Sequence, residues 1–344
     1  MRKYINVLIL IIIVFVSVVL SSSIGAVNVP FNKTINIFLS TIFKNINCNY
    51  TDVQRNIIIG IRLPRVFLGM IVGASLSISG LVFQALLKNP LADPYTLGIS
   101  AGASFGAGIA IFLSYVIGAT FRAFLPIFAF FGGVSTIFLV YFLARVKGRV
   151  QVLTIILAGV VVSYIFSSGV VLIMSLLGDK SHEIIFWLMG SLAGYHSHLI
   201  PLSLAIIIFM LVILFFYRDL DLMSLGDDQA KSLGVNTDFV RIVLFSITSL
   251  ITSISVSLTG TIGFVGLIVP HSMRLIFGPK HKILIPSSIL VGASFLPLSD
   301  CIARTIPSLL FQTGIEIPVG VITSLFGAPF FIFLLIRGKK RYWF

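Results

Sequence analysis

The chain has 344 residues, of which 58% are hydrophobic and only 10% are charged, and its mean hydropathy is +1.11. Because about 25% of the residues of a soluble globular domain are charged, this composition excludes that class and predicts a polytopic membrane protein. The net charge of +13 does not indicate nucleic-acid binding, because the 24 Lys and Arg residues are scattered between apolar runs and form no basic stripe.

Nine stretches without Asp, Glu, Lys or Arg can each hold a helix of about 20 residues that crosses a membrane. They are 4 to 32, 66 to 87, 94 to 121, 123 to 144, 150 to 178, 184 to 217, 242 to 273, 283 to 299 and 317 to 336. The seventh stretch would be about 48 Å long as a straight helix, too long for one span and too short for two. Its helix-interrupting residues are Gly260, Gly263, Gly266 and Pro270. We predict a full helix to about Leu258 and a shorter broken helix from Ile262, which makes about ten transmembrane helices in an all-α fold.

The first stretch allows two interpretations. Arg2 and Lys3 precede an apolar run that ends in SSSIGA, as in a cleaved signal peptide. The run from Tyr4 to Leu20 exceeds the usual signal core of about 7 to 15 residues, which favours an uncleaved first helix. With that helix starting inside, ten helices leave both termini in the cytoplasm. Sixteen of the 24 Lys and Arg residues then lie on the cytoplasmic side, in agreement with the positive-inside rule.

Residues 218 to 241 form a hydrophilic island between the sixth and seventh predicted helices, on the cytoplasmic side. Its acidic residues are Asp219, Asp221, Asp227, Asp228 and Asp238, five of the eleven in the chain. The consecutive pair suits the first turn of a short helix, and Gly234 suits its end. Lys231 stands four residues after the first of that pair, as in a helical ion pair, and Asn236 can cap the following helix. We predict that this island docks a soluble partner.

Small residues recur at four-residue spacing in two predicted helices. One row is Gly98, Gly102 and Gly106, and the other is Gly69, Gly73 and Ser77. Such rows let helix backbones approach closely in lipid, so packing is the preferred interpretation and a pathway-lining role is the alternative. Between the two rows, the segment KNPLADP from Lys88 to Pro94 cannot be helical at Asn89 and Asp93, because each precedes a proline. We predict a tight cytoplasmic turn there.

Four arginines lie on the predicted outer side, although most Lys and Arg residues are predicted to lie on the cytoplasmic side. Arg55, Arg62 and Arg65 lie at the outer end of the second predicted helix, and Arg304 lies at the outer end of the ninth, which is the stretch 283 to 299. Long cationic side chains can reach lipid headgroups, which is one interpretation. The other is an acidic partner outside the cell, since the planar guanidinium group can hold a carboxylate through two hydrogen bonds.

Catalytic and nucleotide-binding motifs are absent from the sequence. It contains no GxSxG, HExxH or Walker A motif, the pair His196 and His198 lacks further ligands for a metal, and Cys48 and Cys301 form no CxxC motif. Asp300 and Glu316 lie near the outer ends of predicted spans, and the long uncharged stretches contain no other carboxylate. Since ion coupling requires ionisable groups deep in the bilayer, a transporter subunit driven by a separate motor is favoured.

Six sequence blocks resemble the FecCD-type permeases of ABC importers for ferric siderophores, haem and cobalamin. They are RLPR (62–65), SGLVFQALLKNPLADPYTLGISAGA (79–103), WLMGSL (187–192), LGDDQAKSLGV (225–235), GTIGFVGLIVPHSMR (260–274) and EIPVGVITSLFGAPFF (316–331). Each block is modest alone, but the six occur in the family's order. The first sixty residues resemble the family only in being a helix and a loop, and Arg55 lies outside its motifs.

The resemblance implies a single permease domain, 1–344, in a cell membrane, either plasma or inner, with residues 218–241 as the ATPase-coupling loop. It implies three kinds of partner: a second permease subunit, identical or paralogous, two cytoplasmic ATPases that hold ATP and Mg²⁺, and an extracytoplasmic binding protein. The chain itself would be no enzyme and would carry no cofactor or metal. A ferric siderophore is the preferred cargo, with haem and cobalamin as alternatives. An ion-coupled carrier and a scaffold or receptor without transport are the competing classes.

Residue roles also follow from the resemblance. The expected contacts with the ATPase are Leu225, Gly226, Ala230, Leu233 and Gly234. Arg62, Arg65 and Arg304 are expected to meet acidic residues of the binding protein. Pro270, His271 and Arg274 belong to a cytoplasmic motif, in which the histidine is expected to be structural rather than catalytic.

Overall fold

The computed structural model describes residues 2–25, 27–43, 50–146, 149–150, 152–194, 199–311 and 316–338. These residues are helical apart from turns and one antiparallel hairpin, β1 (Arg145–Val146) and β2 (Arg149–Val150). The helices are α1 (Arg2–Ser23), α2 (Phe31–Ile42), α3 (Asp52–Arg55), η1 (Asn56–Arg62), α4 (Leu63–Leu86), α5 (Ile99–Val116), η2 (Ala119–Phe124), α6 (Leu125–Ala144), α7 (Val152–Leu177), η3 (Gly178–Ser181), α8 (His182–Leu188), α9 (Leu199–Phe215), α10 (Tyr217–Met223), α11 (Asp227–Ser232), α12 (Thr237–Thr259), α13 (Val265–Phe277), α14 (His281–Phe311) and α15 (Val319–Gly338). The predicted all-α class is confirmed.

Apolar helices occur in the predicted order along the chain. Among the described residues, six helices are long and apolar enough to span a membrane, and α9 with α10, bent by 53°, makes a seventh if counted as one span. Three shorter apolar helices, Val7–Ser23, Val265–Phe277 and Val319–Leu334, complete the set. The multi-pass membrane class is therefore confirmed. The exact number of crossings and the cytoplasmic termini stay predictions.

The predicted break after the seventh helix is present. α12 ends at Thr259 and α13 begins at Val265, and the break contains Gly260 and Phe264 in the left-handed region, with φ of +71° and +68°. α12 also starts with its predicted cap, because the Asn236 side chain accepts a hydrogen bond from a backbone N–H of the first turn at 3.1 Å.

Several predicted spans have different limits from those expected, and among them the ninth helix, α14, continues from His281 through Asp300 and Arg304 to Phe311. The second helix is continuous from Asp52 to Leu86, 35 residues, so it passes through Arg62 and Arg65 instead of starting after them. The stretch 184 to 217 is divided, because α8 ends at Leu188 and α9 begins at Leu199. Glycines with positive φ lie in that interruption, at Gly190 and Gly194.

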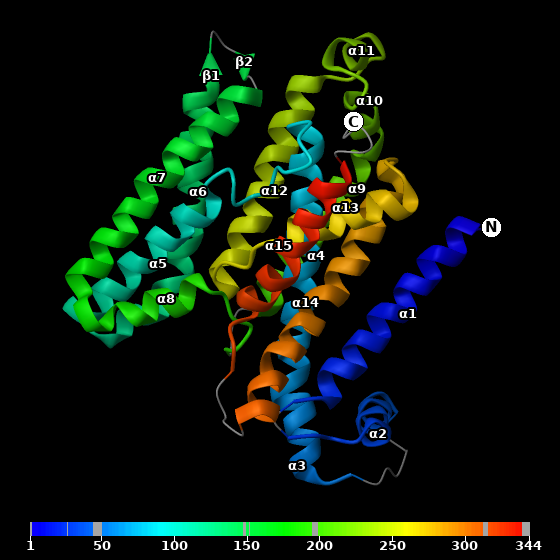
Figure 1. Ribbon diagram of the computed structural model, residues 1–344, viewed down its shortest axis with the longest axis vertical. Coiled ribbons are helices and arrows are strands. Elements are labelled where there is room, and N and C mark those ends of the chain that lie inside the picture. Colours follow the sequence, from blue (N-terminus) through cyan, green and yellow to red (C-terminus); the bar gives the residue numbers. More distant parts are fainter. Residues whose placement is uncertain are drawn as a thin grey trace.

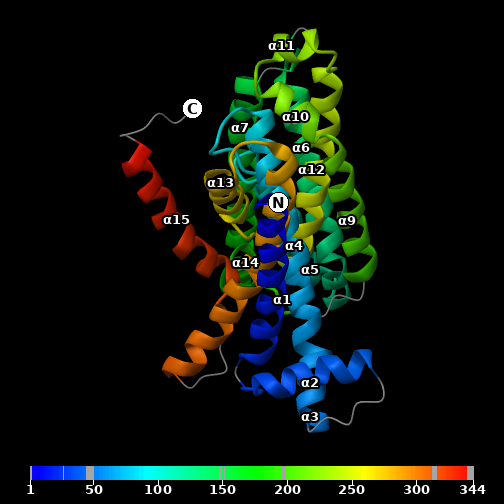
Figure 2. The ribbon, with the colours of Figure 1, turned by 90° about the vertical axis from the view of Figure 1, so that its right-hand side faces the viewer.

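α4 is the central helix of the bundle, and 89% of its most apolar window is buried. It packs on α13 and α14 on one side and on α12 on the other, while α5, α6 and α7 form a second group beyond α12 (Figure 1). A hydrogen bond of 2.6 Å between the hydroxyls of Ser75 and Ser255 joins α4 to α12. α15 leans away from the other helices at one side of the bundle (Figure 2).

Glycines set the distance between the most closely packed helices. A Cβ atom at Gly73 of α4 would overlap the carbonyl oxygen of Gly292 in α14. A Cβ atom at Gly102 of α5 would overlap the carbonyl oxygen of Gly132 in α6, and one at Gly106 would likewise strike the backbone of α6. These contacts are helix packing, which small residues permit in membrane proteins.

The two ends of the bundle carry different elements. α10, α11 and the β1–β2 hairpin lie at one end, whereas α2 and α3 lie at the other (Figure 1). α2 runs across the bundle axis there (Figure 2).

Candidate functional site

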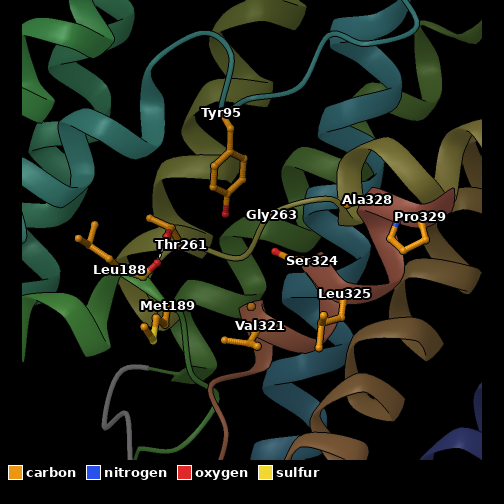
Figure 3. Close-up of a pocket in the computed structure, with 11 residues that line it drawn as sticks. Tyr95, Leu188, Met189, Thr261, Gly263, Val321, Ser324, Leu325, Ala328 and Pro329 are labelled. Atoms are coloured by element: carbon orange, nitrogen blue, oxygen red, sulfur yellow. Dashed lines mark hydrogen bonds between the residues drawn. The ribbon is translucent and has the colours of Figure 1, made fainter. Parts of the chain in front are cut away.

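A cavity of about 670 Å³ opens beside α15, where that helix stands away from the bundle. Its wall is made of Tyr95, Leu188, Met189, Thr261, Gly263, Gly320, Val321, Ser324, Leu325, Ala328 and Pro329 (Figure 3). Four parts of the chain contribute: the segment between α4 and α5, the end of α8, the break between α12 and α13, and α15. Non-helical backbone at membrane depth is tolerated where it lines protein or a cavity, which explains the position of the break.

The lining is mostly apolar and contains no charged side chain. Its polar side chains are the hydroxyls of Tyr95, Thr261 and Ser324, and the Tyr95 hydroxyl points into the cavity (Figure 3). The Thr261 hydroxyl donates to the carbonyl oxygen of Leu188. Within the described part of the chain, no group of three His, Cys, Asp or Glu side chains could hold a metal ion. The wall therefore suits the organic surface of a molecule better than a bare ion.

Polar groups behind the wall hold the turn between α4 and α5 against α13. Asp93 is 4% exposed, and one of its carboxylate oxygens lies against Gly266 of α13. Burial raises the pKa of the Asp93 carboxyl to about 7, although a hydrogen bond from the backbone of Tyr95 acts in the opposite direction. The Gln84 side chain donates to the Gly266 carbonyl oxygen at 3.1 Å and accepts from Arg274 at 3.2 Å.

The predicted cytoplasmic motif lies on α13. Pro270 is buried inside the helix, and the Arg274 guanidinium reaches Gln84 at the end of α4. The ring of His271 lies 6.3 Å from the rings of Phe330 and Phe331 in α15, measured between centroids. The motif therefore contacts two neighbours of α13, the central α4 and the cavity-lining α15.

The hydrophilic island folds into α10 and α11, at the end of the molecule opposite α2 (Figure 1). Gly226 and Gly234 flank α11 with φ of +132° and +89°, which lets the chain turn sharply at both of its ends. Leu225 and Leu233 expose 64% and 60% of their surfaces, whereas Ala230 is fully buried. The predicted coupling residues therefore include two leucines that a partner can touch and one alanine that anchors α11 to the fold.

The ion pairs of the island differ from the predicted one. Lys231 lies 3.4 Å from Asp238, not beside Asp227. Asp227 instead accepts from Lys88 at 2.9 Å and from Arg241 at 2.6 Å. Burial acts to raise the pKa of Asp227, but the hydrogen bonds and positive charges of these two side chains outweigh it and lower the pKa below its usual value.

Arg62, predicted at the outer surface, is buried within the chain and only 5% exposed. Its guanidinium donates to the carbonyl oxygens of Ser22 at 2.8 Å and Ser23 at 2.9 Å, and also to that of Val27. The last carbonyl groups of a helix have no partner within it and attract a cation. Arg62 therefore caps the C-terminal end of α1 from the next long helix.

Arg65 and Arg304 share one buried carboxylate. Arg65 donates to both oxygens of Asp300, at 2.9 and 2.7 Å, and to Glu316 at 2.7 Å. Arg304 lies 3.0 Å from Asp300 and donates to the carbonyl oxygen of Ser21 at 2.9 Å. Asp300 is 2% exposed and Glu316 is 42% exposed. In this structure all three predicted docking arginines are bonded inside the chain, so their contact with a binding protein stays a prediction.

Other predicted residues have simpler positions. Gly69 of α4 lies close to Leu192 and Pro297, and Gly98 precedes α5 with φ of +84°. None of the five predicted glycines is among the cavity-lining residues. His196 and His198 lie outside the described residues.

Sequence reasoning did not single out the cavity-lining residues Tyr95, Met189 and Ser324. A signal for Tyr95 was present, because two prolines exclude a helix just before it and so make it part of an irregular segment at the membrane. Met189 and Ser324 gave no such signal, since the approach of α8 to α15 depends on contacts between segments far apart in the sequence.

Comparisons with known proteins agree with this architecture. The model of the FecCD transport family matches residues 10–337. A probable iron chelatin transport system permease protein of Helicobacter pylori (strain J99) is 41% identical over 82% of this chain and 83% of its own length. A cobalamin import system permease protein of Halobacterium salinarum is 40% identical over 83% of this chain and 75% of its own length.

A solved structure has the same fold over nearly the whole chain. It is described as a metal-chelate type ABC transporter in an inward-facing conformation, with a TM-score of 0.79 and 29% sequence identity. The match covers 97% of this chain and 99% of the other. On the family match and these similarities, the chain belongs to the FecCD transport family.

Proposed function

We propose that this chain is the membrane-spanning permease subunit of an ATP-binding-cassette importer. The observation that carries the proposal is α11, a short helix at one end of the bundle with Leu225 and Leu233 exposed on either side of it. Exposed apolar side chains beside acidic residues form a surface that a soluble partner can cover. Membership in the FecCD family and the names of the relatives support this interpretation.

The proposal includes three kinds of partner. Two cytoplasmic ATPases would bind α11 on the two permease subunits and would hold the ATP and Mg²⁺. A second permease subunit, identical or paralogous, would face α15 and close the cavity into a shared pathway. An extracytoplasmic binding protein would dock at the end that carries α2 and α3.

The predicted outer arginines contribute to this docking surface because they hold the helices that form it in place. Arg62 and Arg304 hold the end of α1 against α4 and α14. Arg65, 13% exposed, and its partner Glu316, 42% exposed, are the members of the network nearest to the surface. We propose this pair as the part of the network that meets a binding protein.

The proposed cargo is a metal chelate, with a ferric siderophore as the preferred member and haem and cobalamin as alternatives. The apolar wall with its three hydroxyls can pass an organic shell that hides the charge of the metal. The relatives named for iron chelatin and cobalamin support the class without selecting one member.

Transport in proteoliposomes tests the class of function. The permease would be reconstituted with its ATPase and binding protein, and uptake of radioactive iron as a ferric hydroxamate chelate, and of cyanocobalamin, would be measured. We expect uptake only when ATP, the ATPase and the binding protein are all present. Uptake by the permease alone, driven by an ion gradient, would overturn the proposal in favour of a secondary carrier.

Substitution of the exposed leucines tests the docking helix. Leu225→Asp with Leu233→Asp removes apolar contact area and adds charge, so co-purification of the ATPase should be lost, while Gln229→Glu adds charge to α11 without removing a leucine and should keep it. Undiminished ATPase binding by the double variant would remove α11 from the docking surface.

A further inference from the structure

α11, the helix proposed to bind the ATPase and called the coupling helix below, is bonded to two other parts of the chain. Both bonds are made by a single carboxylate, that of Asp227, its first residue. One oxygen accepts from Lys88, which follows α4, at 2.9 Å. The other accepts from Arg241 in α12 at 2.6 Å. The Arg241 side chain is 11% exposed and that of Lys88 is 42% exposed, so the bond from Arg241 is sheltered and the bond from Lys88 lies in water.

Lys88 opens a segment that runs directly to the cavity. Its φ of +47° is rare for a residue other than glycine and turns the chain sharply away from α4. From there the chain passes the buried Asp93 and reaches Tyr95, whose hydroxyl points into the cavity (Figure 3). Only seven positions therefore separate the lysine bound to the coupling helix from the tyrosine of the cavity wall.

Hydrogen bonds within this segment make it a stiff unit. The N–H of Asn89 donates to the carbonyl of Gln84 at 3.2 Å, and the N–H of Ala92 donates to that of Asn89 at 3.0 Å. The N–H of Thr96 donates to Asp93, and that of Gly98 donates to the carbonyl of Tyr95, each at 3.0 Å. A displacement at Lys88 is consequently carried along the segment instead of being absorbed by a flexible loop.

We propose that the ion pair between Asp227 and Lys88 is the link through which a displacement of α11 reaches the cavity wall at Tyr95. The inference rests on the proposed function, in which an ATPase moves α11. Lys88 and Asp227 are positioning residues in this scheme, because neither lines the cavity.

The exposure of the pair suits a contact that breaks and forms again during a transport cycle. Ion pairs between partly exposed side chains add little to stability in water, so the fold does not depend on this one. A docked ATPase that excluded water from α11 would strengthen it, because attraction between charges increases as the local dielectric constant falls. The pair Lys231–Asp238, 3.4 Å apart and more exposed, lies within the island and does not reach the cavity segment, so it provides a matched control.

The test measures whether nucleotide at the ATPase changes access to the cavity. In a background where Cys48 and Cys301 are replaced by serine, Ser324→Cys places a thiol in the cavity wall. The rate of its labelling by a maleimide would be compared, in the complex with the ATPase, without nucleotide and with Mg-ATP and vanadate. We expect Lys88→Met to reduce the nucleotide-dependent change by about 3- to 10-fold, as when a contact between coupled sites is removed. Lys88→Arg and the control Asp238→Asn should retain the change.

Co-purification of the ATPase distinguishes the ways in which the idea can fail. A full nucleotide-dependent change in Lys88→Met, with the ATPase bound, overturns the link. Loss of ATPase binding in Lys88→Met also overturns it, since Lys88 would then belong to the docking surface. If no ATPase binds the unsubstituted protein, the proposed function itself fails.

Discussion

Arg62 shows that a cationic side chain on one helix can satisfy the last carbonyl groups of another helix. Because its guanidinium satisfies carbonyl oxygens of Ser22, Ser23 and Val27, Arg62→Ala would leave buried acceptors without donors. An unsatisfied buried polar group costs about 1–3 kcal/mol, so we expect Arg62→Ala to lower the melting temperature of the purified protein clearly. The exposed Arg55, on the same continuous helix, is the control, and Arg55→Ala should leave the melting temperature unchanged. Equal melting temperatures for both variants would contradict the capping role.

Asp93 should make stability depend on pH. Its pKa is raised to about 7 by burial, so the folded protein keeps the proton that the unfolded chain loses near pH 4. The stability contributed by this proton is complete at low pH and is lost as the pH rises to about 7, at about 1.4 kcal/mol per pH unit. We expect Asp93→Asn to melt increasingly above the unsubstituted protein between pH 5 and pH 8. Asp228→Asn, an exposed control, should show no such trend. If the melting temperatures of Asp93→Asn and of the unsubstituted protein changed in parallel with pH, the prediction would be refuted.

At the scale of single residues, the sequence located charges but not their partners. It predicted Arg65, Arg304, Asp300 and Glu316 near one side of the membrane, and the structure joins these four side chains in one network. It could not pair them, because Arg65 and Asp300 are 235 positions apart and only the packing of α4 on α14 brings them together.

The packing of α5 on α6 depends on the absence of a single carbon atom. Gly102→Ala would place a Cβ atom into the backbone of α6, and because backbone cannot move aside cheaply, the two helices would have to separate. Overpacking of this kind costs about 1–3 kcal/mol. Gly60→Ala, whose Cβ atom would meet nothing within 4 Å, is the matched control. Thermal unfolding in detergent should show a lower melting temperature only for Gly102→Ala; no difference would mean that α5 and α6 tolerate separation.

At the scale of elements, helix breaks were predicted better than helix lengths. Gly260 and Gly263 predicted the interruption between α12 and α13, because glycine adopts backbone conformations that end a helix, whereas Pro270 lies inside α13. Charged residues were less reliable as markers of helix ends. Arg62 and Arg65 lie inside a continuous helix, since partners from other helices neutralise the cost of burying them.

On one side of the whole molecule α15 stands away from the other helices, and the cavity beside α15 opens there (Figure 2). If a second copy covers this side, Leu325→Cys, in the cysteine-free background, should form a disulfide-linked dimer in membranes under mild oxidation. Leu325 is 64% exposed and lines the cavity. Phe142→Cys, at a position 78% exposed on α6, is the control and should stay monomeric. Cross-linking at position 142 but not at 325 would place the second copy against α6 instead of α15.

One continuous helix also gives the molecule a lever. The 35 residues from Asp52 to Leu86 span about 52 Å, more than the hydrocarbon thickness of a membrane, with Arg65 close to the midpoint and Lys88 just beyond one end. A rigid tilt of about 5° about the midpoint would shift each end by about 2 Å. That is enough to lengthen the Lys88–Asp227 contact of 2.9 Å beyond hydrogen-bonding range. Arg65, about 6 Å from the midpoint, would move by only about 0.5 Å and would keep its contact with Asp300. Binding of a protein on one face of the membrane could thus change a contact on the other face through the tilt of one rigid helix, without any helix unfolding between them.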